Sequence, residues 1–418
     1  MGLLRYTCSM KLSELQEISA SQKAPLESRD QGLLRQILPK LPNLRSHALV
    51  VCGIRRCGKS TLLNQFVQKL NKPYFYLNFD DIRFASFTSD DFTLIDRVIA
   101  DSGARLIFLD EIQSADKWEL YVRQKLDEGF QIVITGSNAS LLSRELGSRL
   151  TGRHLSRELF PFSYKEFCSF LKLEAGAESL MGYLEKGGFP EFLKTGNADV
   201  LSQLQSDILY RDIAVRYGIR DVASLRQLFV YLLSNSTQLF SPSKLTNIIS
   251  AKSSTTVLEY ISFFEAAYLI QLLPCFAWSV KAQSLAPKKV YVSDTGLIRT
   301  GAISFSKNYG ALLENFVYNG FRSNSGDSCS MNDRELFYYA GKKGGECDFI
   351  VRTPEKTQCF QVCWELNAEN QDREINGLID AMNFFNLKKG EIITYNTEDT
   401  ILSRGKKINV IPAWKRFY

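Results

Sequence analysis

A run of eight residues after an apolar segment constrains the fold of this 418-residue chain more than any other feature. It reads Gly53-Ile54-Arg55-Arg56-Cys57-Gly58-Lys59-Ser60 and fits the pattern G-x-x-x-x-G-K-[ST]. A helical pattern follows it directly. In this context glycines let the backbone curl so that its N–H groups face phosphate oxygens. The run therefore predicts a nucleotide site on an α/β fold with a parallel sheet.

Residues of this loop have separate expected roles at the nucleotide. Lys59 adds a positive charge beside the β- and γ-phosphates, the Ser60 hydroxyl can hold Mg²⁺, and Thr61 follows as a neighbour of the α-phosphate. The rest of the loop supplies the phosphate cradle, from Gly53, Arg55, Arg56, Cys57 and Gly58. The expected cofactors are therefore ATP and Mg²⁺.

Two adjacent acids are expected to complete the site. The apolar residues Leu106–Leu109 read as a buried strand that ends in Asp110 and Glu111. Asp110 can reach Mg²⁺ through water, and Glu111 can polarise the attacking water as a general base. The next apolar run ends in Ser137 and Asn138. We expect a short polar side chain there, with Asn138 as the candidate, to orient that water or to sense the γ-phosphate. A helix N-cap at Ser137 or Asn138 is the alternative.

Short apolar runs alternate with helical patterns over the first 230 residues, as in a parallel sheet covered by helices. The expected strands are Ala48–Cys52, Tyr74–Asn78, Arg105–Asp110, Gln131–Gly136 and His154–Leu159. The expected helices between them are Ser60–Leu70, Trp118–Glu128 and Ser140–Leu146.

Two arginines, Arg149 and Arg153, precede the last of these strands. An arginine at this edge can cross to the γ-phosphate of a neighbouring subunit and stabilise the charge of the transition state. A surface arginine or an ion pair within the domain is the alternative for each.

Five sequence blocks in a fixed order resemble one known family. They are GIRRCGKSTLL, LDEIQ with a following Trp118, TGSNASLLSRELGSRLTGR, LFPFSYKEF and GGFPEFL. This order is similar to that of the bacterial and archaeal AAA+ ATPases that carry a C-terminal DUF4143 domain, and the resemblance covers essentially the whole chain.

The resemblance implies an AAA+ P-loop core at residues 1–160, a helical lid at 161–224, a winged-helix segment at 225–300 and an α/β domain at 301–418. That last domain would be similar to PD-(D/E)xK nucleases. The family default is a homo-oligomer, a hexamer. Arg211 and Asp212 match a recurring pair of the lid, as an ion pair or a nucleotide contact.

The middle segment carries most of the positive charge. The net charge of the chain is +6, and residues 226–300 hold seven Lys and Arg side chains against three Asp and Glu. Short helices near 225–233, 242–249 and 253–267, with strands at 268–274 and 288–293, would form a winged helix. The candidate DNA contacts are Lys252, Ser253, Ser254, Thr255, Lys288 and Lys289. A packing or partner-binding module, with these hydroxyls as an N-cap cluster, is the alternative.

The resembled nuclease site is incomplete in this sequence. Glu314 and Asp348 match two of its acids, but Gln361 stands where a third carboxylate belongs and Cys363 where a lysine belongs. An amide adds no charge for a metal ion, and a thiol cannot stabilise an attacked phosphate as an ammonium does. We therefore expect no DNA cleavage. If the domain does cleave DNA, Glu365 is the candidate for the missing third acid.

Composition argues against a membrane protein, a secreted protein and a structural zinc protein. No run of roughly 18 apolar residues occurs, the nine cysteines lack C-x-x-C spacing, and only two histidines are present. The first residues lack the apolar core of a signal peptide, so we expect a cytoplasmic protein without membrane contacts. The sequence favours an oligomeric ATPase that acts on DNA. A nucleotide-dependent switch for a protein partner and an ATP-regulated nuclease are the alternatives.

Overall fold

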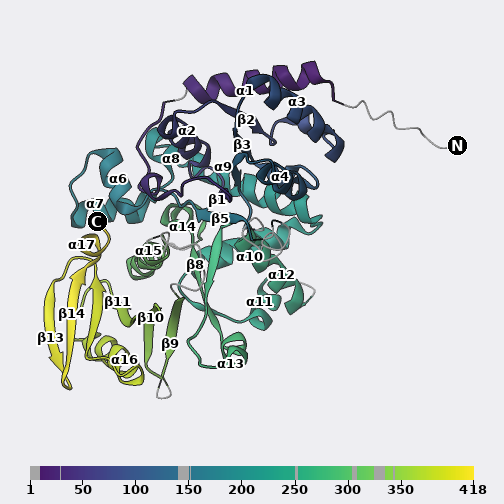
Figure 1. The fold of residues 1–418 in the computed structure, drawn as a ribbon. Helices are drawn as coiled ribbons and strands as arrows, with labels where there is room; N and C mark the ends of the chain where they lie inside the picture. Colours follow the sequence, from purple (N-terminus) through teal and green to yellow (C-terminus); the bar gives the residue numbers. More distant parts are fainter. Residues whose placement is uncertain are drawn as a thin grey trace. The chain divides into compact units, whose positions relative to one another are not determined.

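The computed structural model describes residues 10–28, 30–139, 150, 152–249, 253–303, 308–323, 335–341 and 344–418. Figure 1 shows their helices and strands. The chain divides into two compact units, Met1–Leu159 and Phe160–Tyr418. The expected boundaries at 224 and 300 therefore lie inside the second unit. Among the helices of these residues, none has both the length and the apolar character needed to cross a membrane.

A five-stranded parallel sheet forms the centre of the first unit. Its strands are β1 (Ala48–Cys52), β2 (Tyr74–Asn78), β3 (Leu106–Asp110), β4 (Gln131–Gly136) and β5 (His154–Glu158), in the order β2-β3-β4-β1-β5. Strands β1 to β4 are buried almost throughout, as expected of continuous apolar runs covered on both faces. The predicted α/β class is confirmed, with strand ends within one residue of those expected.

Helices accompany this sheet. They are α1 (Leu12–Ser28), α2 (Lys59–Leu70), α3 (Phe92–Ser102) and α4 (Trp118–Asp127), with short 3₁₀ turns at Leu38–Lys40, Ile82–Phe84, Ser89–Asp91 and Ile112–Ser114. Helix α1 packs against β2 and α3. The expected helix Ser140–Leu146 lies outside the described residues.

The second unit begins with helices. They are α6 (Tyr164–Leu171), α7 (Ala177–Lys186), α8 (Pro190–Thr195), α9 (Asp199–Asp207), a π-helical stretch at Ile208–Val215, and α10 (Val222–Ser234). A small antiparallel sheet follows, with strands β6 (Leu239–Phe240), β7 (Ile270–Leu273) and β8 (Lys288–Val292) in the order β6-β8-β7. Helices α11 (Pro242–Ile248), α12 (Ser254–Ala266) and α13 (Val280–Leu285) lie between these strands along the chain.

A mixed six-stranded sheet forms the rest of the second unit. The elements are α14 (Thr295–Gly301), α15 (Tyr309–Ser323), β9 (Glu335–Ala340), β10 (Glu346–Arg352), β11 (Thr357–Val362), α16 (Gln371–Phe384), β12 (Lys389–Thr394), β13 (Asp399–Ser403), β14 (Lys406–Pro412) and α17 (Ala413–Arg416). The strand order is β13-β14-β12-β11-β10-β9. Successive residues of β11 point to opposite faces. Cys359 packs in a cluster with α16, and the Phe360 ring lies 4.6 Å from that of Phe321 in α15, so helices cover both faces.

Candidate nucleotide site and the acidic cluster of the second unit

The loop between β1 and α2 curls tightly. Gly53 and Gly58 have φ values of +152° and +102°, which favour glycine, and a Cβ on Gly53 would overlap the carbonyl oxygen of Leu159. Lys59 is 6% exposed, and its Nζ donates to the carbonyl oxygens of Gly53 (3.1 Å) and Ile54 (3.2 Å). The backbone thus has the cradle shape that phosphate binding needs.

A segment before β1, which carries no recognisable motif, holds this loop. Arg35 is 4% exposed and donates from Nη1 to the carbonyl oxygen of Cys57 at 2.8 Å. The Gln65 side chain in α2 fixes the segment: it accepts from the Arg35 N–H at 3.1 Å and donates to the carbonyl oxygens of Gln31 and Leu33. Arg35 therefore positions the phosphate loop.

Hydroxyl groups hold Asp110 at the end of β3. Its carboxylate accepts hydrogen bonds from Ser60 (3.0 Å), Tyr76 (3.1 Å) and Thr135. Burial and then the neighbouring Glu111 charge raise the pKa of Asp110. A hydroxyl beside a buried carboxylate is a donor set that suits Mg²⁺, and a bound cation would favour the ionised carboxylate.

Glu111 lies beside Lys59 in the left-handed conformation, with φ of +51°. One carboxylate oxygen is 3.6 Å from the Lys59 Nζ. The other accepts from Gln113 Nε2 (2.5 Å), the Ser137 N–H (3.0 Å) and the Ser137 hydroxyl (3.1 Å). Burial works to raise the pKa of Glu111, but the Lys59 ammonium and these hydrogen bonds lower it on balance. Glu111 is thus ionised and aimed by fixed donors.

The structure brings Lys59, Ser60, Asp110 and Glu111 together. The sequence pattern singled out Asn138, which is buried, but the donors to Glu111 at this strand end come from its neighbour Ser137. Because β3 and β4 are adjacent parallel strands, their carboxyl ends meet, and this geometry also brings in Thr135.

The other expected loop residues have varied surroundings. Arg55 lies 3.7 Å from Asp80, and Arg56 is exposed with φ of +62°. Burial raises the pKa of the Cys57 thiol, and Thr61 is half-buried in the first turn of α2.

Of the two arginines expected to act on a neighbouring subunit, the structure describes only Arg153. Arg149 lies outside the described residues. Arg153 pairs within the first unit, with its Nη1 2.8 Å from Asp127 Oδ1. This contact supports the ion-pair alternative for Arg153.

The hydroxyl residues expected to contact DNA lie at the start of α12. Ser253 is the N-cap, and its hydroxyl accepts from the Thr256 N–H at 3.2 Å. Ser254 and Thr255 are exposed, and Lys252 lies outside the described residues.

The two lysines expected in the wing point in different directions. Lys288 is half-buried, whereas Lys289 is only 4% exposed. Neighbouring residues of a strand face opposite sides, and β8 turns Lys289 inward. The expectation that Lys289 contacts DNA is therefore wrong.

Lys289 instead joins the two acids of the expected nuclease-like site. Its Nζ lies 3.1 Å from Glu314 Oε1 and 3.0 Å from Asp348 Oδ1. Burial and then the Asp348 charge raise the pKa of Glu314 to about 7. The expectation of a site without a lysine, drawn from Cys363, is thus corrected: an ammonium is present, and it comes from β8.

The remaining residues of that expected site have other contacts. Gln361 accepts from the Asp348 N–H at 3.3 Å and donates to Glu374 in α16 at 2.7 Å. Cys363 packs in the apolar cluster of α16, and Glu365 is exposed. The acid that contacts Gln361 is therefore Glu374 rather than the expected substitute Glu365.

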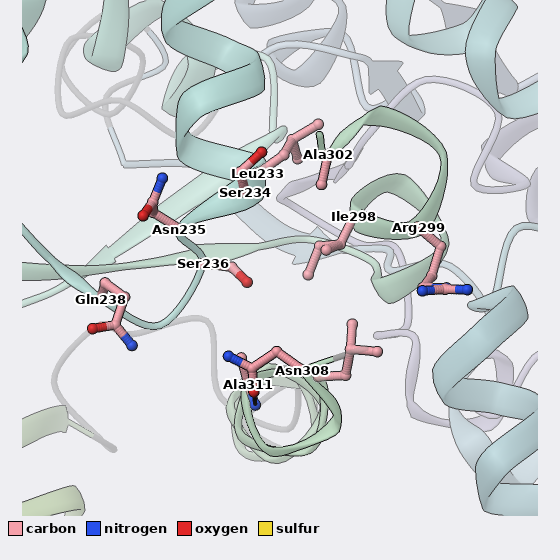
Figure 2. A pocket seen from close by; sticks show the side chains of 11 residues that line it. Leu233, Ser234, Asn235, Ser236, Gln238, Ile298, Arg299, Ala302, Asn308 and Ala311 are labelled. Carbon is pink, nitrogen blue, oxygen red and sulfur yellow. Dashed lines mark hydrogen bonds between the residues drawn. The ribbon is translucent and has the colours of Figure 1, made fainter. Parts of the chain in front are cut away.

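The second unit also has a polar cavity of about 370 Å³ (Figure 2). Side chains of α14, of the start of α15 and of the turn after α10 line it, and its polar members are Ser234, Asn235, Ser236, Gln238, Arg299 and Asn308. Hydroxyls, amides and a guanidinium suit water or a small polar molecule. No sequence motif pointed to this cavity.

Family models match most of the chain. A model described as "AAA domain" matches residues 45–168, a "Domain of unknown function (DUF8612)" matches 177–306, and a "Domain of unknown function (DUF4143)" matches 309–415. The first match contains the loop and both acids of the nucleotide site. The third contains Glu314 and Asp348.

Relatives without a described function align over most of their length. The uncharacterised protein MJ1544 of Methanocaldococcus jannaschii is 33% identical over 393 residues, which cover 88% of this chain and 87% of that protein. An uncharacterised protein of Haemophilus influenzae is 30% identical over 348 residues, which cover 78% of this chain and 84% of that protein. Among solved structures, AMPPCP-bound DnaA from Aquifex aeolicus matches with a TM-score of 0.28 and 16% identity, over 63% of this chain and 93% of that chain.

Proposed function

Since this chain belongs to the family of AAA-domain proteins that carry a C-terminal DUF4143 domain, we propose that it binds ATP with Mg²⁺ and hydrolyses it. One observation carries the proposal. Asp110 and Glu111 are adjacent but have separate donors. Hydroxyl groups of Ser60 and Tyr76 hold Asp110, whereas Ser137 donates to Glu111 through its N–H and its hydroxyl. The other Glu111 oxygen lies 3.6 Å from the Lys59 ammonium. Such a division suits one acid that binds a cation and one that acts on water.

Each residue has a separate proposed role. Lys59 and the backbone N–H groups of the loop hold the phosphates, and Ser60 and Asp110 hold Mg²⁺. When bound, Mg²⁺ neutralises charge on the phosphates. Glu111 orients a water molecule and accepts its proton.

The proposal is tested by two variants at the same site. Lys59→Ala should abolish binding of a fluorescent ATP analogue, because it removes the charge that faces the phosphates. Glu111→Gln should keep that binding and lower phosphate release by about 10²-fold or more, because it removes only the group that acts on water. Lys72→Ala changes an exposed lysine and serves as the control.

Two results would contradict the proposal. A Glu111→Gln protein with the parent rate would show that Glu111 is not the base. A parent protein that neither binds nor hydrolyses ATP would remove the proposed activity altogether.

We also propose that the nucleotide state controls DNA binding by residues 222–292. The supporting observation is the chain order α10, β6, α11, α12, β7, α13, β8 with a β6-β8-β7 sheet, which, apart from the added α13, is similar to that of a winged helix. The second helix of such a pair enters the major groove with its first residues. Here those residues include Ser254 and Thr255, both exposed. Because Lys289 is buried, the lysines that remain as candidate phosphate contacts are the half-buried Lys288, the exposed Lys244 and Lys281, and Lys252, which lies outside the described residues.

This second proposal predicts a salt dependence. Log affinity falls as log salt rises, and each phosphate contact that is lost should make this slope shallower by about 0.9. Lys252→Ala combined with Lys288→Ala should therefore reduce the slope by about 2, whereas Lys388→Ala combined with Lys389→Ala, two exposed lysines before and at the start of β12, should leave it unchanged. If no nucleotide state gives salt-sensitive DNA binding, the switch that acts on a protein partner becomes the better interpretation.

A further inference from the structure

A single lysine lies among three carboxylates in the second unit. The Lys289 Nζ is 2.6 Å from Glu346 Oε1, 3.0 Å from Asp348 Oδ1 and 3.1 Å from Glu314 Oε1. Its side chain is 5% exposed, while that of Glu346 is 40% exposed. Three acids thus surround one ammonium at a place that solvent reaches from the Glu346 side.

Three separate elements build this cluster: β8, α15 and β10 (Figure 1). Tyr291 in β8 donates to Glu314 at 2.7 Å. The Asn315 amide in α15 accepts from the Val292 N–H and donates to the Val292 carbonyl oxygen, both at 2.8 Å, so α15 is fixed to β8. The elements are therefore held together by more than the lysine.

Neighbouring groups also fix the orientation of Asp348. Its second carboxylate oxygen accepts from the Val362 N–H at 2.9 Å, and its own N–H donates to Gln361. The Gln361 amide is itself held by Glu374. Asp348 thus presents its remaining oxygen to Lys289 from a prearranged position.

The position of the ammonium is one that a metal ion would need. Buried carboxylates that face one another repel unless a cation lies between them, and hard divalent cations bind such oxygens at about 2.0–2.6 Å. In the part of the chain that the structure describes, no group of three acids, histidines or cysteines is spaced to hold a metal. The Lys289 Nζ lies 3.1 Å from Glu314 and 3.0 Å from Asp348, which are distances of hydrogen bonds to an ammonium rather than of bonds to a metal ion.

We propose that Lys289 is a built-in cation that occupies a divalent-cation site formed by Glu314, Glu346 and Asp348. While the ammonium is in place, the cluster takes no metal and serves to join β8 to α15 and β10. Without it, the same three carboxylates bind a divalent cation. The proposal does not depend on ATP hydrolysis.

Binding of Mn²⁺ to the nucleotide-free, full-length protein tests this directly, with electron paramagnetic resonance as the readout. The parent and Asp348→Asn should bind Mn²⁺ equally. Lys289→Met should bind Mn²⁺ at least about tenfold more tightly than the parent, and the gain should vanish in Lys289→Met combined with Asp348→Asn. The melting temperature of Lys289→Met alone should fall in EDTA and recover with Mn²⁺, because an acidic cluster without a cation is destabilising.

Two outcomes would overturn the proposal. Mn²⁺ binding by the parent that is lost in Asp348→Asn would mean that Lys289 shares the site with a metal, and Asp348-dependent cleavage of supercoiled DNA would point the same way. A Lys289→Met protein without added Mn²⁺ affinity would mean that no latent site exists. If Lys289→Met does not fold, Lys289→Gln replaces it, because glutamine keeps a hydrogen-bond donor without the charge. The comparison of the parent with Asp348→Asn still decides whether the parent site holds Mn²⁺.

Discussion

At the scale of single residues, Ser137 controls the direction of Glu111. Both its N–H and its hydroxyl donate to the same carboxylate oxygen, and Ser137 is only 6% exposed. Ser137→Ala removes the hydroxyl and keeps the backbone contact. A hydrogen bond to a charged group contributes about 1.5–3 kcal/mol, so we expect turnover to fall by about tenfold or more with ATP affinity nearly unchanged.

Phosphate release and ATP-analogue binding, measured on the same preparations, separate these two effects. Thr93→Ala, which removes an exposed hydroxyl of α3, should change neither. A Ser137→Ala protein that loses affinity as much as turnover would instead assign this serine to nucleotide binding.

At the scale of elements, Asp294 explains the glycine pair of the GGFP turn. The carboxylate is 2% exposed and accepts from the Gly188 N–H (2.7 Å) and the Gly296 N–H (2.8 Å). A Cβ on Gly187 would overlap this carboxylate, and one on Gly188 would overlap the carbonyl oxygen of Phe162. The turn after α7 is thus joined to the start of α14 by a buried acid.

This acid gives the stability of the second unit a pH dependence. Burial raises the pKa of Asp294 from 3.8 to about 7. Between these values the unfolded chain has lost the proton and the folded chain keeps it, so stability falls as pH rises. The expected slope is about 1.4 kcal/mol per pH unit for one proton, and it levels off above the folded pKa.

Urea unfolding across this range measures the effect. Asp294→Asn has no proton to take up, so the difference in stability between the parent and this variant should shrink as pH rises through the range. Parallel pH profiles for the two proteins would show that Asp294 does not titrate in this way.

The sequence predicted the elements better than the contacts between them. Continuous apolar runs identified the buried strands, and the loop pattern placed Lys59 and Ser60. Thr135 and Arg35 carry no motif, because their roles arise only where neighbouring strands and the segment before β1 meet. Lys289 shows the same limit: its sequence neighbourhood is basic, but the partners that decide its role lie 25 and 59 residues away along the chain.

At the scale of the whole molecule, turnover in a homo-oligomer would depend on an arginine from the neighbouring subunit. Arg153 has an intradomain partner in Asp127, so we propose that Arg149 acts in trans. Arg149→Ala should then lower turnover by about 10³-fold and leave ATP affinity nearly intact, because such an arginine stabilises only transition-state charge. Arg153→Ala is the matched control and should keep most of the parent activity.

Mixing two inactive proteins tests the subunit boundary itself. Lys59→Ala lacks a working phosphate loop and Arg149→Ala lacks the arginine, but a hybrid interface pairs an intact loop with an intact Arg149. Phosphate release should therefore recover in part in the mixture, while sedimentation with ATP measures whether the subunits assemble. Mixtures that stay inactive although the subunits exchange, or a monomer with full turnover, would place every catalytic group within one chain.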